Sequence, residues 1–175
     1  MPTDALLVVD MQQGLLLGMP KHQLPGVVQR INRLAARVRQ RGGSVIFIRH
    51  EGPAGDAFEP GSTGWQFLRD LDVVPGDRVV SKTLNDPFAG TSLHAALAGL
   101  GRPRVLVTGW ATDLCVDACV RSAVAVGFDV VAVADCHTVS DRPHLRAEDV
   151  ITHHHWVWSN LIASSTLSIA AECEI

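Results

Sequence analysis

Short apolar runs rich in β-branched residues alternate along the chain with longer segments in which apolar residues recur at helical spacing. Unbroken apolar runs occur at residues 6–9, 45–48, 79–80, 105–108 and 130–133. Runs that are apolar on both faces are typical of strands in a parallel sheet that helices cover on both sides. The pattern therefore predicts parallel strands at these positions.

Apolar residues spaced three and four apart predict helices between and after these strands. These segments run from residue 27 to 38, 93 to 100, 116 to 124 and 150 to 162, and glycines follow the first three. A glycine after the last periodic residue is a common helix stop. The alternation predicts a doubly wound α/β domain, with a mostly parallel six-stranded sheet and helices on both faces, as in a Rossmann-like three-layer sandwich.

Residues 51–76 form the least regular part of the chain, with Pro53, Pro60, Pro75 and several glycines. A loop of this length in a compact domain is usually functional or mobile. Open α/β folds bind ligands at the carboxyl ends of their strands. We therefore expect a flap over that edge, and the alternative is a surface excursion with no role.

Composition limits the class of protein. The 175 residues fit one domain, at about 150 residues per domain, so we expect a single domain over residues 1–175. Hydrophobic residues make up 47% and charged residues 19%, which excludes a disordered linker or a fibrous chain. The net charge of −3 provides no basic surface for a polyanion, so we expect no nucleic-acid partner.

The first apolar run, residues 5–9, is too short for a signal peptide or a membrane span and has no basic leader. We therefore expect a cytoplasmic protein without a membrane partner. The cysteines Cys115, Cys119, Cys136 and Cys173 show no CxxC spacing. In a reducing compartment each is a free thiol, either a small buried side chain or a nucleophile.

Polar residues follow the predicted strands at the edge where their carboxyl ends meet. Asp10 follows the first strand, Lys82 the third, and Cys115 comes soon after the fourth, where a helix is expected to begin. A helix N-terminus and a nearby cation both favour the reactive thiolate. Thr112 and Asp113 are helix-capping residue types, and the backbone donors of that first turn would face a developing negative charge. The sequence therefore predicts a nucleophilic thiol with an oxyanion site.

Three segments together resemble the isochorismatase-like cysteine hydrolases, the superfamily that includes nicotinamidases and other amidases. They are ALLVVDMQQGLL at residues 5–16, SKTLNDPFAGTSL at 81–93 and VLVTGWATDLCVDACVRSAVAVGFDVVAVADC at 105–136. The resemblance implies a catalytic triad of Asp10, Lys82 and Cys115. In this scheme the sulfur attacks an amide carbonyl, the carboxylate carries the protons and the ammonium stabilises the charged pair.

The resemblance also implies a cis peptide bond between Trp110 and Ala111, with the backbone N–H groups of Ala111 and Cys115 forming the oxyanion hole. The family pattern places Phe88 at the cleft, Trp110 flanks the cis bond, and Gln12 lies two positions after the catalytic carboxylate. We expect all three side chains to bind substrate. The alternatives are core packing for the two aromatic residues and backbone binding for Gln12.

We expect no metal and no cofactor. Nicotinamidases of this superfamily carry an acidic residue and several histidines in a loop after the second strand, where this chain has Arg49-His50-Glu51 and no further histidine before His94. This departure puts nicotinamide in doubt as the substrate. Residues 153–155 are consecutive histidines, which on a helix point about 100° apart and cannot chelate one ion together.

The function that we expect is cleavage of a C–N, amide-type bond in a small molecule through a thioester on Cys115. Within the superfamily, the alternative is another small amide, a urea-type or an ester substrate. From other classes, the alternatives are a catalytically silent α/β ligand-binding protein and a thiol redox enzyme with Cys119 as its resolving cysteine. The resemblance also implies a homo-oligomer, a dimer or tetramer, and Trp156 and Trp158 are either core residues or subunit contacts.

Overall fold

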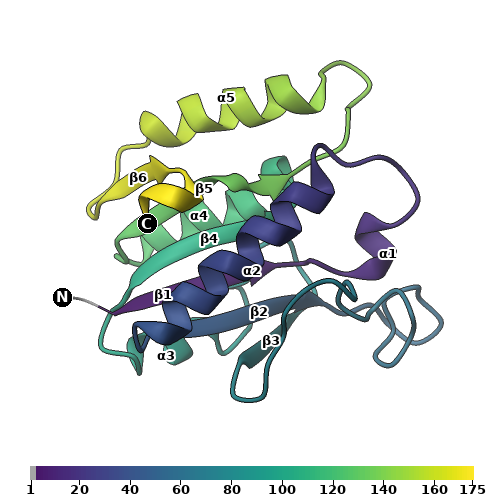
Figure 1. Ribbon diagram of the computed structural model, residues 1–175, viewed down its shortest axis with the longest axis horizontal. Coiled ribbons are helices and arrows are strands. Elements are labelled where there is room, and N and C mark those ends of the chain that lie inside the picture. The colour runs from purple at the N-terminus through teal and green to yellow at the C-terminus, as the bar shows by residue number, and fades with distance from the viewer. Residues whose placement is uncertain (1–2) are drawn as a thin grey trace.

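The computed structural model describes residues 3–175, and its centre is a six-stranded sheet (Figure 1). The strands are β1 (Asp4–Val9), β2 (Ser44–His50), β3 (Arg78–Lys82), β4 (Arg104–Trp110), β5 (Val130–Thr138) and β6 (Leu167–Ala170). They lie in the order β3-β2-β1-β4-β5-β6, and every neighbouring pair is parallel. The predicted α/β class and parallel sheet are confirmed.

Helices cover both faces of this sheet. They are α1 (Gln13–Leu16), α2 (Leu24–Gln40), α3 (Leu93–Ala98), α4 (Asp117–Ala125) and α5 (Ala147–Ser159), with a π-helical turn η1 (Thr112–Val116) and a 3-10 turn η2 (Glu172–Glu174). Helix α2 lies in front of the sheet in Figure 1, and α3 and α4 lie behind it. Alternate side chains of β1 point to opposite faces of the sheet. Leu6 and Val8 pack with α2, whereas Leu7 and Val9 pack with α3 and α4. No helix within residues 3–175 has the length and apolar character needed to cross a membrane.

Helix α1 and the loop between β2 and β3 both lie beyond the carboxyl ends of the strands (Figure 1). The backbone amides of Gln13 and Gly14 donate to the carbonyl oxygens of Gln66 and Gly64, at 2.8 and 3.0 Å. Leu68, further along the loop, is buried in the core on the α2 side. The segment expected to act as a flap therefore packs on α1 in this structure.

Strands β1 and β4 approach each other unusually closely at Gly109. This glycine has a φ of 117°. A Cβ atom there would lie 2.1 Å from the carbonyl oxygen of Val9 and 2.6 Å from its nitrogen. Only glycine allows this contact, which sets the position of Asp10, the residue after Val9, relative to Trp110, the residue after Gly109.

Replacement of Gly109 by alanine should therefore disrupt the centre of the sheet. We expect the free energy of unfolding to fall by at least ~3 kcal/mol, because the new methyl group meets backbone atoms and the φ is unfavourable for alanine. Gly101→Ala is the matched control: its φ is also positive, at 77°, but no atom lies within 4 Å of the added Cβ. The control should cost about 1 kcal/mol. Urea unfolding followed by circular dichroism measures both, and equal losses would contradict the close contact.

Candidate active site

The carboxyl ends of three strands bring Asp10, Lys82 and Cys115 into contact. Lys82 is the last residue of β3, Asp10 directly follows β1 with a φ of 51°, and Cys115 lies in the turn η1 after β4. The ammonium nitrogen Nζ of Lys82 lies 2.7 Å from Oδ2 of Asp10 and 3.3 Å from Sγ of Cys115. A carboxylate, an amine and a thiol that are far apart in sequence thus form one cluster.

The ammonium group of Lys82 is completely buried. Its side chain is 0% exposed and that of Asp10 is 1% exposed. Nζ also donates to the carbonyl oxygen of Leu84 at 3.0 Å, so the three N–H donors of the lysine match three partners. Within residues 3–175, Oδ1 of Asp10 is buried without a hydrogen-bond partner. That oxygen is therefore available to accept a proton.

Burial raises the pKa of both acidic groups in the cluster. It raises the pKa of Asp10, against the lowering effect of the Lys82 charge. It also raises the pKa of Cys115 to about 12, where the Asp10 charge adds to the rise and Lys82 offsets part of it. The sequence favoured a thiolate beside a cation, but burial and the carboxylate outweigh that cation. The resting sulfur is therefore a thiol that faces a potential base.

The turn that carries Cys115 is wider than an α-helical turn. The amides of Leu114 and Val116 both donate to the carbonyl oxygen of Ala111, at 3.0 and 3.1 Å. The peptide bond between Trp110 and Ala111 is cis. Among residues 3–175, no hydrogen-bond acceptor is found for the amide of Ala111. This amide and the sulfur are thus held in one short segment.

The two expected capping residues do not cap this turn. The hydroxyl of Thr112 is hydrogen-bonded to His137, and the carboxylate of Asp113 forms a bidentate pair with Arg142 at 2.6 and 2.7 Å. Their partners are distant in sequence, so local spacing could not identify them. The residue types were suited to the N-terminus of the helix, but the structure uses them for tertiary contacts.

A cavity of about 130 Å³ opens beside the sulfur. Its wall consists of the cluster residues Asp10 and Cys115 together with Leu15, His50, Asn85, Trp110, Ala111 and Leu114. Trp110 and Ala111 were predicted for this site, whereas Leu15, His50, Asn85 and Leu114 were not. Asn85 places Oδ1 3.6 Å from the sulfur. Asn85 lies in the segment 81–93, three residues after Lys82, and His50 is the last residue of the second strand. Their positions near the carboxyl ends of the strands could therefore have identified both as site residues.

Gln12 and Phe88 lie outside the wall of this cavity. The side-chain amide of Gln12 is fully buried and donates to the carbonyl oxygens of His50 and Trp65 at 2.9 and 3.1 Å, while its Oε1 accepts the His50 amide at 2.8 Å. Phe88 packs against Phe128, with ring centroids 6.5 Å apart. Gln12 therefore joins β2 to the loop, and Phe88 packs at the margin of the core.

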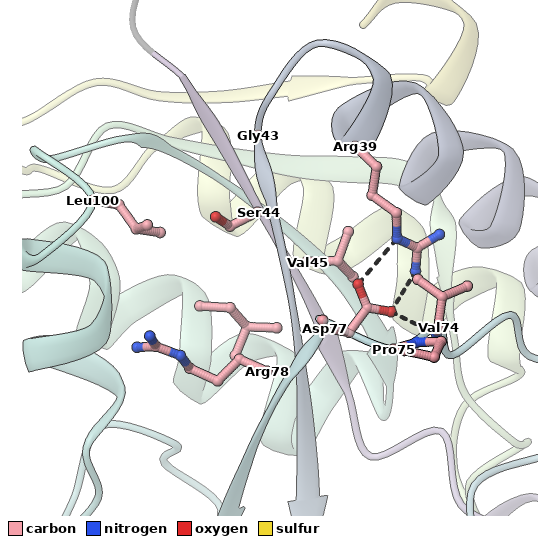
Figure 2. Close-up of a pocket in the computed structure, with 11 residues that line it drawn as sticks. Arg39, Gly43, Ser44, Val45, Val74, Pro75, Asp77, Arg78 and Leu100 are labelled. Carbon is pink, nitrogen blue, oxygen red and sulfur yellow. Dashed lines mark hydrogen bonds and ion pairs between the residues drawn. The ribbon is translucent and has the colours of Figure 1, made fainter.

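A separate pocket of about 250 Å³ lies at the opposite edge of the sheet, at the amino ends of β2 and β3 (Figure 2). Figure 2 shows Arg39 paired with Asp77 there, with contacts of 2.6 and 3.0 Å. No predicted site residue lines this pocket. Within residues 3–175, no group of three or more His, Cys, Asp or Glu side chains is placed to hold a metal ion.

Comparisons with known proteins show the family of this chain. A model of the isochorismatase domain matches residues 4–153. A streptothricin hydrolase from Streptomyces noursei is 34% identical over 141 residues, which are 80% of this chain and 51% of the relative. The chain thus spans about half the length of that relative. The ureidoacrylate amidohydrolase RutB of Variovorax paradoxus is 26% identical over 169 residues, 75% of this chain and 67% of RutB.

The solved structures show the same fold. The crystal structure of an isochorismatase family protein has a TM-score of 0.87 and 29% identity, and the match covers 97% of this chain and 98% of that one. The domain model covers most of the chain, and the parallel sheet has the same arrangement as the solved relative. The chain belongs to the isochorismatase family.

Proposed function

We propose that the protein is a cysteine hydrolase that cleaves an amide-type C–N bond in a small molecule, without a metal or cofactor. One observation carries the proposal: the sulfur of Cys115 lies 3.3 Å from the Lys82 ammonium, which is itself 2.7 Å from the Asp10 carboxylate, and the sulfur borders a small cavity. Streptothricin hydrolase and ureidoacrylate amidohydrolase, named among the relatives, support this class of reaction.

In the first half of the proposed reaction, Asp10 takes the thiol proton while the sulfur of Cys115 bonds to the amide carbon. The carbonyl oxygen gains the negative charge and accepts hydrogen bonds from the backbone amides of Ala111 and Cys115. The C–N bond then breaks, Asp10 returns its proton to the departing nitrogen, and the acyl group stays on sulfur as a thioester. The raised pKa of Asp10 suits a group that acts first as base and then as acid.

In the second half, Asp10 takes a proton from a water molecule that attacks the thioester carbon. The C–S bond breaks, the proton returns to the sulfur, and a carboxylic acid leaves. Lys82 serves as the fixed cation, since Nζ lies beside the Asp10 carboxylate, which holds the negative charge before the attack, and beside the sulfur that bonds to the substrate. The charge thus starts next to this cation and passes on to the carbonyl oxygen of the substrate.

The cavity favours a small substrate with an uncharged acyl group. Leu15, Leu114 and Trp110 provide apolar surface, whereas His50 and Asn85 provide hydrogen-bonding groups. We infer that these two polar side chains bind a second polar group of the substrate, as a urea-type or other small amide would offer.

Assembly and location stay proposals. Trp158 is buried, but Trp156 and Ile162 on and after α5 are 65% and 103% exposed. Exposed large apolar groups support a homo-oligomer, a dimer or tetramer, in which a second copy covers this region. We also propose a cytoplasmic location for the enzyme.

Replacement of Cys115 by alanine should abolish turnover and leave the fold intact, because the side chain stays small and apolar. We expect amide hydrolysis to fall below about 0.1% of the parent rate, measured as ammonia release from a panel of small amides and ureas. Cys173→Ser is the matched control, since Cys173 is an exposed free thiol far from the triad in sequence, and it should keep full activity. Turnover retained by Cys115→Ala would refute the assignment of Cys115 as the nucleophile.

Dialysis against a chelator should leave activity unchanged, because the proposed steps use only side chains and backbone amides. The same ammonia assay, before and after dialysis and with added divalent ions, measures this. A loss that added metal restores would contradict the metal-independent mechanism.

Two charge-removing substitutions should move the Cys115 pKa in opposite directions. Asp10→Asn removes a charge that raises the thiol pKa, so alkylation by iodoacetamide at neutral pH should become faster while turnover is lost. Lys82→Met removes the charge that lowers the thiol pKa, so alkylation of Cys115 should require a higher pH than in the parent. Peptide mapping in a Cys173→Ser background measures the rate at Cys115 across pH, with circular dichroism confirming the fold. Profiles identical to the parent's would contradict the coupling of the three groups.

A further inference from the structure

Behind the turn η1 lies a chain of hydrogen bonds that the proposed reaction does not use. Oγ1 of Thr112 lies 2.8 Å from Nδ1 of His137, and Nε2 of His137 lies 3.0 Å from Nε2 of His155. Thr112 and His137 are buried, and His155 is half-buried. The chain therefore connects the first residue of η1 through β5 to the outer helix α5.

The same helix also holds the other end of the turn. Trp158 of α5 is buried, and its Nε1 donates to Oδ1 of Asp117 at 2.8 Å. Asp117 directly follows η1 and begins α4. The indole ring packs edge-on against His137, with centroids 5.3 Å apart. Two independent contacts from α5 thus hold the two ends of the segment that carries Cys115.

The charge state of the two rings limits the directions that the hydrogen bonds can take. Burial lowers the pKa of His137 to about 3, and the neighbouring His155 and His154 add to the fall. Burial, followed by the neighbouring His154, also lowers the pKa of His155, and the nearby backbone of Ala134 offsets part of this fall. Both imidazoles are therefore neutral near pH 7, and each has one donor and one acceptor nitrogen.

Neutral rings leave two consistent arrangements, because Nε2 of either histidine can donate to Nε2 of the other. When Nε2 of His137 donates, its Nδ1 accepts from the hydroxyl of Thr112; when it accepts, its Nδ1 donates to that hydroxyl. In both cases each bond sets the direction of the next, and the chain links Thr112 to the outer helix.

We propose that His137 is a positioning residue, which acts through Thr112 to hold the turn η1 so that the sulfur of Cys115 stays beside Lys82 in the cluster with Asp10. The inference rests on the proposed function for its effect on catalysis, but the placement of the sulfur can be measured without turnover. A turn released at Thr112 lets the thiol move toward solvent and away from the carboxylate. Catalysis then falls, and the pKa of Cys115 moves down toward its ordinary value.

The test compares Thr112→Val, which keeps the shape and loses the hydroxyl, with Thr112→Ser, which keeps the hydroxyl. For the valine variant we expect kcat to fall at least ~10-fold with KM changed less than about 3-fold, since small displacements of reacting groups are costly. We expect iodoacetamide alkylation of Cys115 to shift to lower pH. The serine variant should match the parent in kcat and in alkylation profile.

A second pair of variants tests the same contact in case the valine variant does not fold. His137→Asn places its amide near the former Nδ1 and retains the Thr112 contact, whereas His137→Gln reaches toward His155 and loses it. The glutamine variant should therefore show the same loss and alkylation shift, and the asparagine variant should stay closer to the parent.

An alkylation profile unchanged in both Thr112→Val and His137→Gln would overturn the proposal, whether or not kcat falls, because the sulfur would not have moved. If the parent hydrolyses no member of the amide panel, the proposed function fails, and the alkylation profiles still decide the positioning role.

Discussion

The site depends on one buried positive charge. An ammonium group taken out of water is unfavourable by several kcal/mol unless it is paired and fully hydrogen-bonded. Lys82 meets this condition with a carboxylate from the end of β1, a sulfur from the turn after β4 and the carbonyl of Leu84. These groups meet only if the parallel strands end at a common edge, so the stability of the charge and the register of the sheet depend on each other.

The charge balance of this cluster also constrains how the proposed reaction proceeds. With the sulfur as a thiol, Lys82 and Asp10 form a neutral pair, and transfer of the proton from sulfur to carboxylate keeps the total charge unchanged. Because burial raises the thiol pKa to about 12, a free thiolate is scarce at neutral pH. In the proposed reaction the proton therefore leaves as the bond from sulfur to carbon forms, when the charge passes on to the carbonyl oxygen. Under this proposal, activation of the sulfur requires a bound substrate.

The sheet and the main helices could be predicted from sequence because strands buried on both faces leave continuous apolar runs, as at residues 6–9 and 105–108. The sixth strand, β6, is short and only half-buried, so no such run marks it. Motif resemblance located the three residues of the cluster, but it could not tell which way nearby side chains point. Gln12 lies two residues after Asp10, whose φ is positive, and its amide turns to the backbone of His50 and Trp65 instead of the cavity.

The consecutive histidines of α5 show what periodicity alone leaves open about that helix. Successive residues on a helix point about 100° apart, so the three side chains meet three environments. His153 is exposed, His154 bonds the carbonyl of Val150 in the same helix, and His155 reaches the buried His137. A pattern that excluded a shared metal ion was therefore still compatible with one inward hydrogen-bonding group. That group makes α5 part of the support for Cys115, so sequence changes in this outer helix can affect the nucleophile without altering the cavity wall.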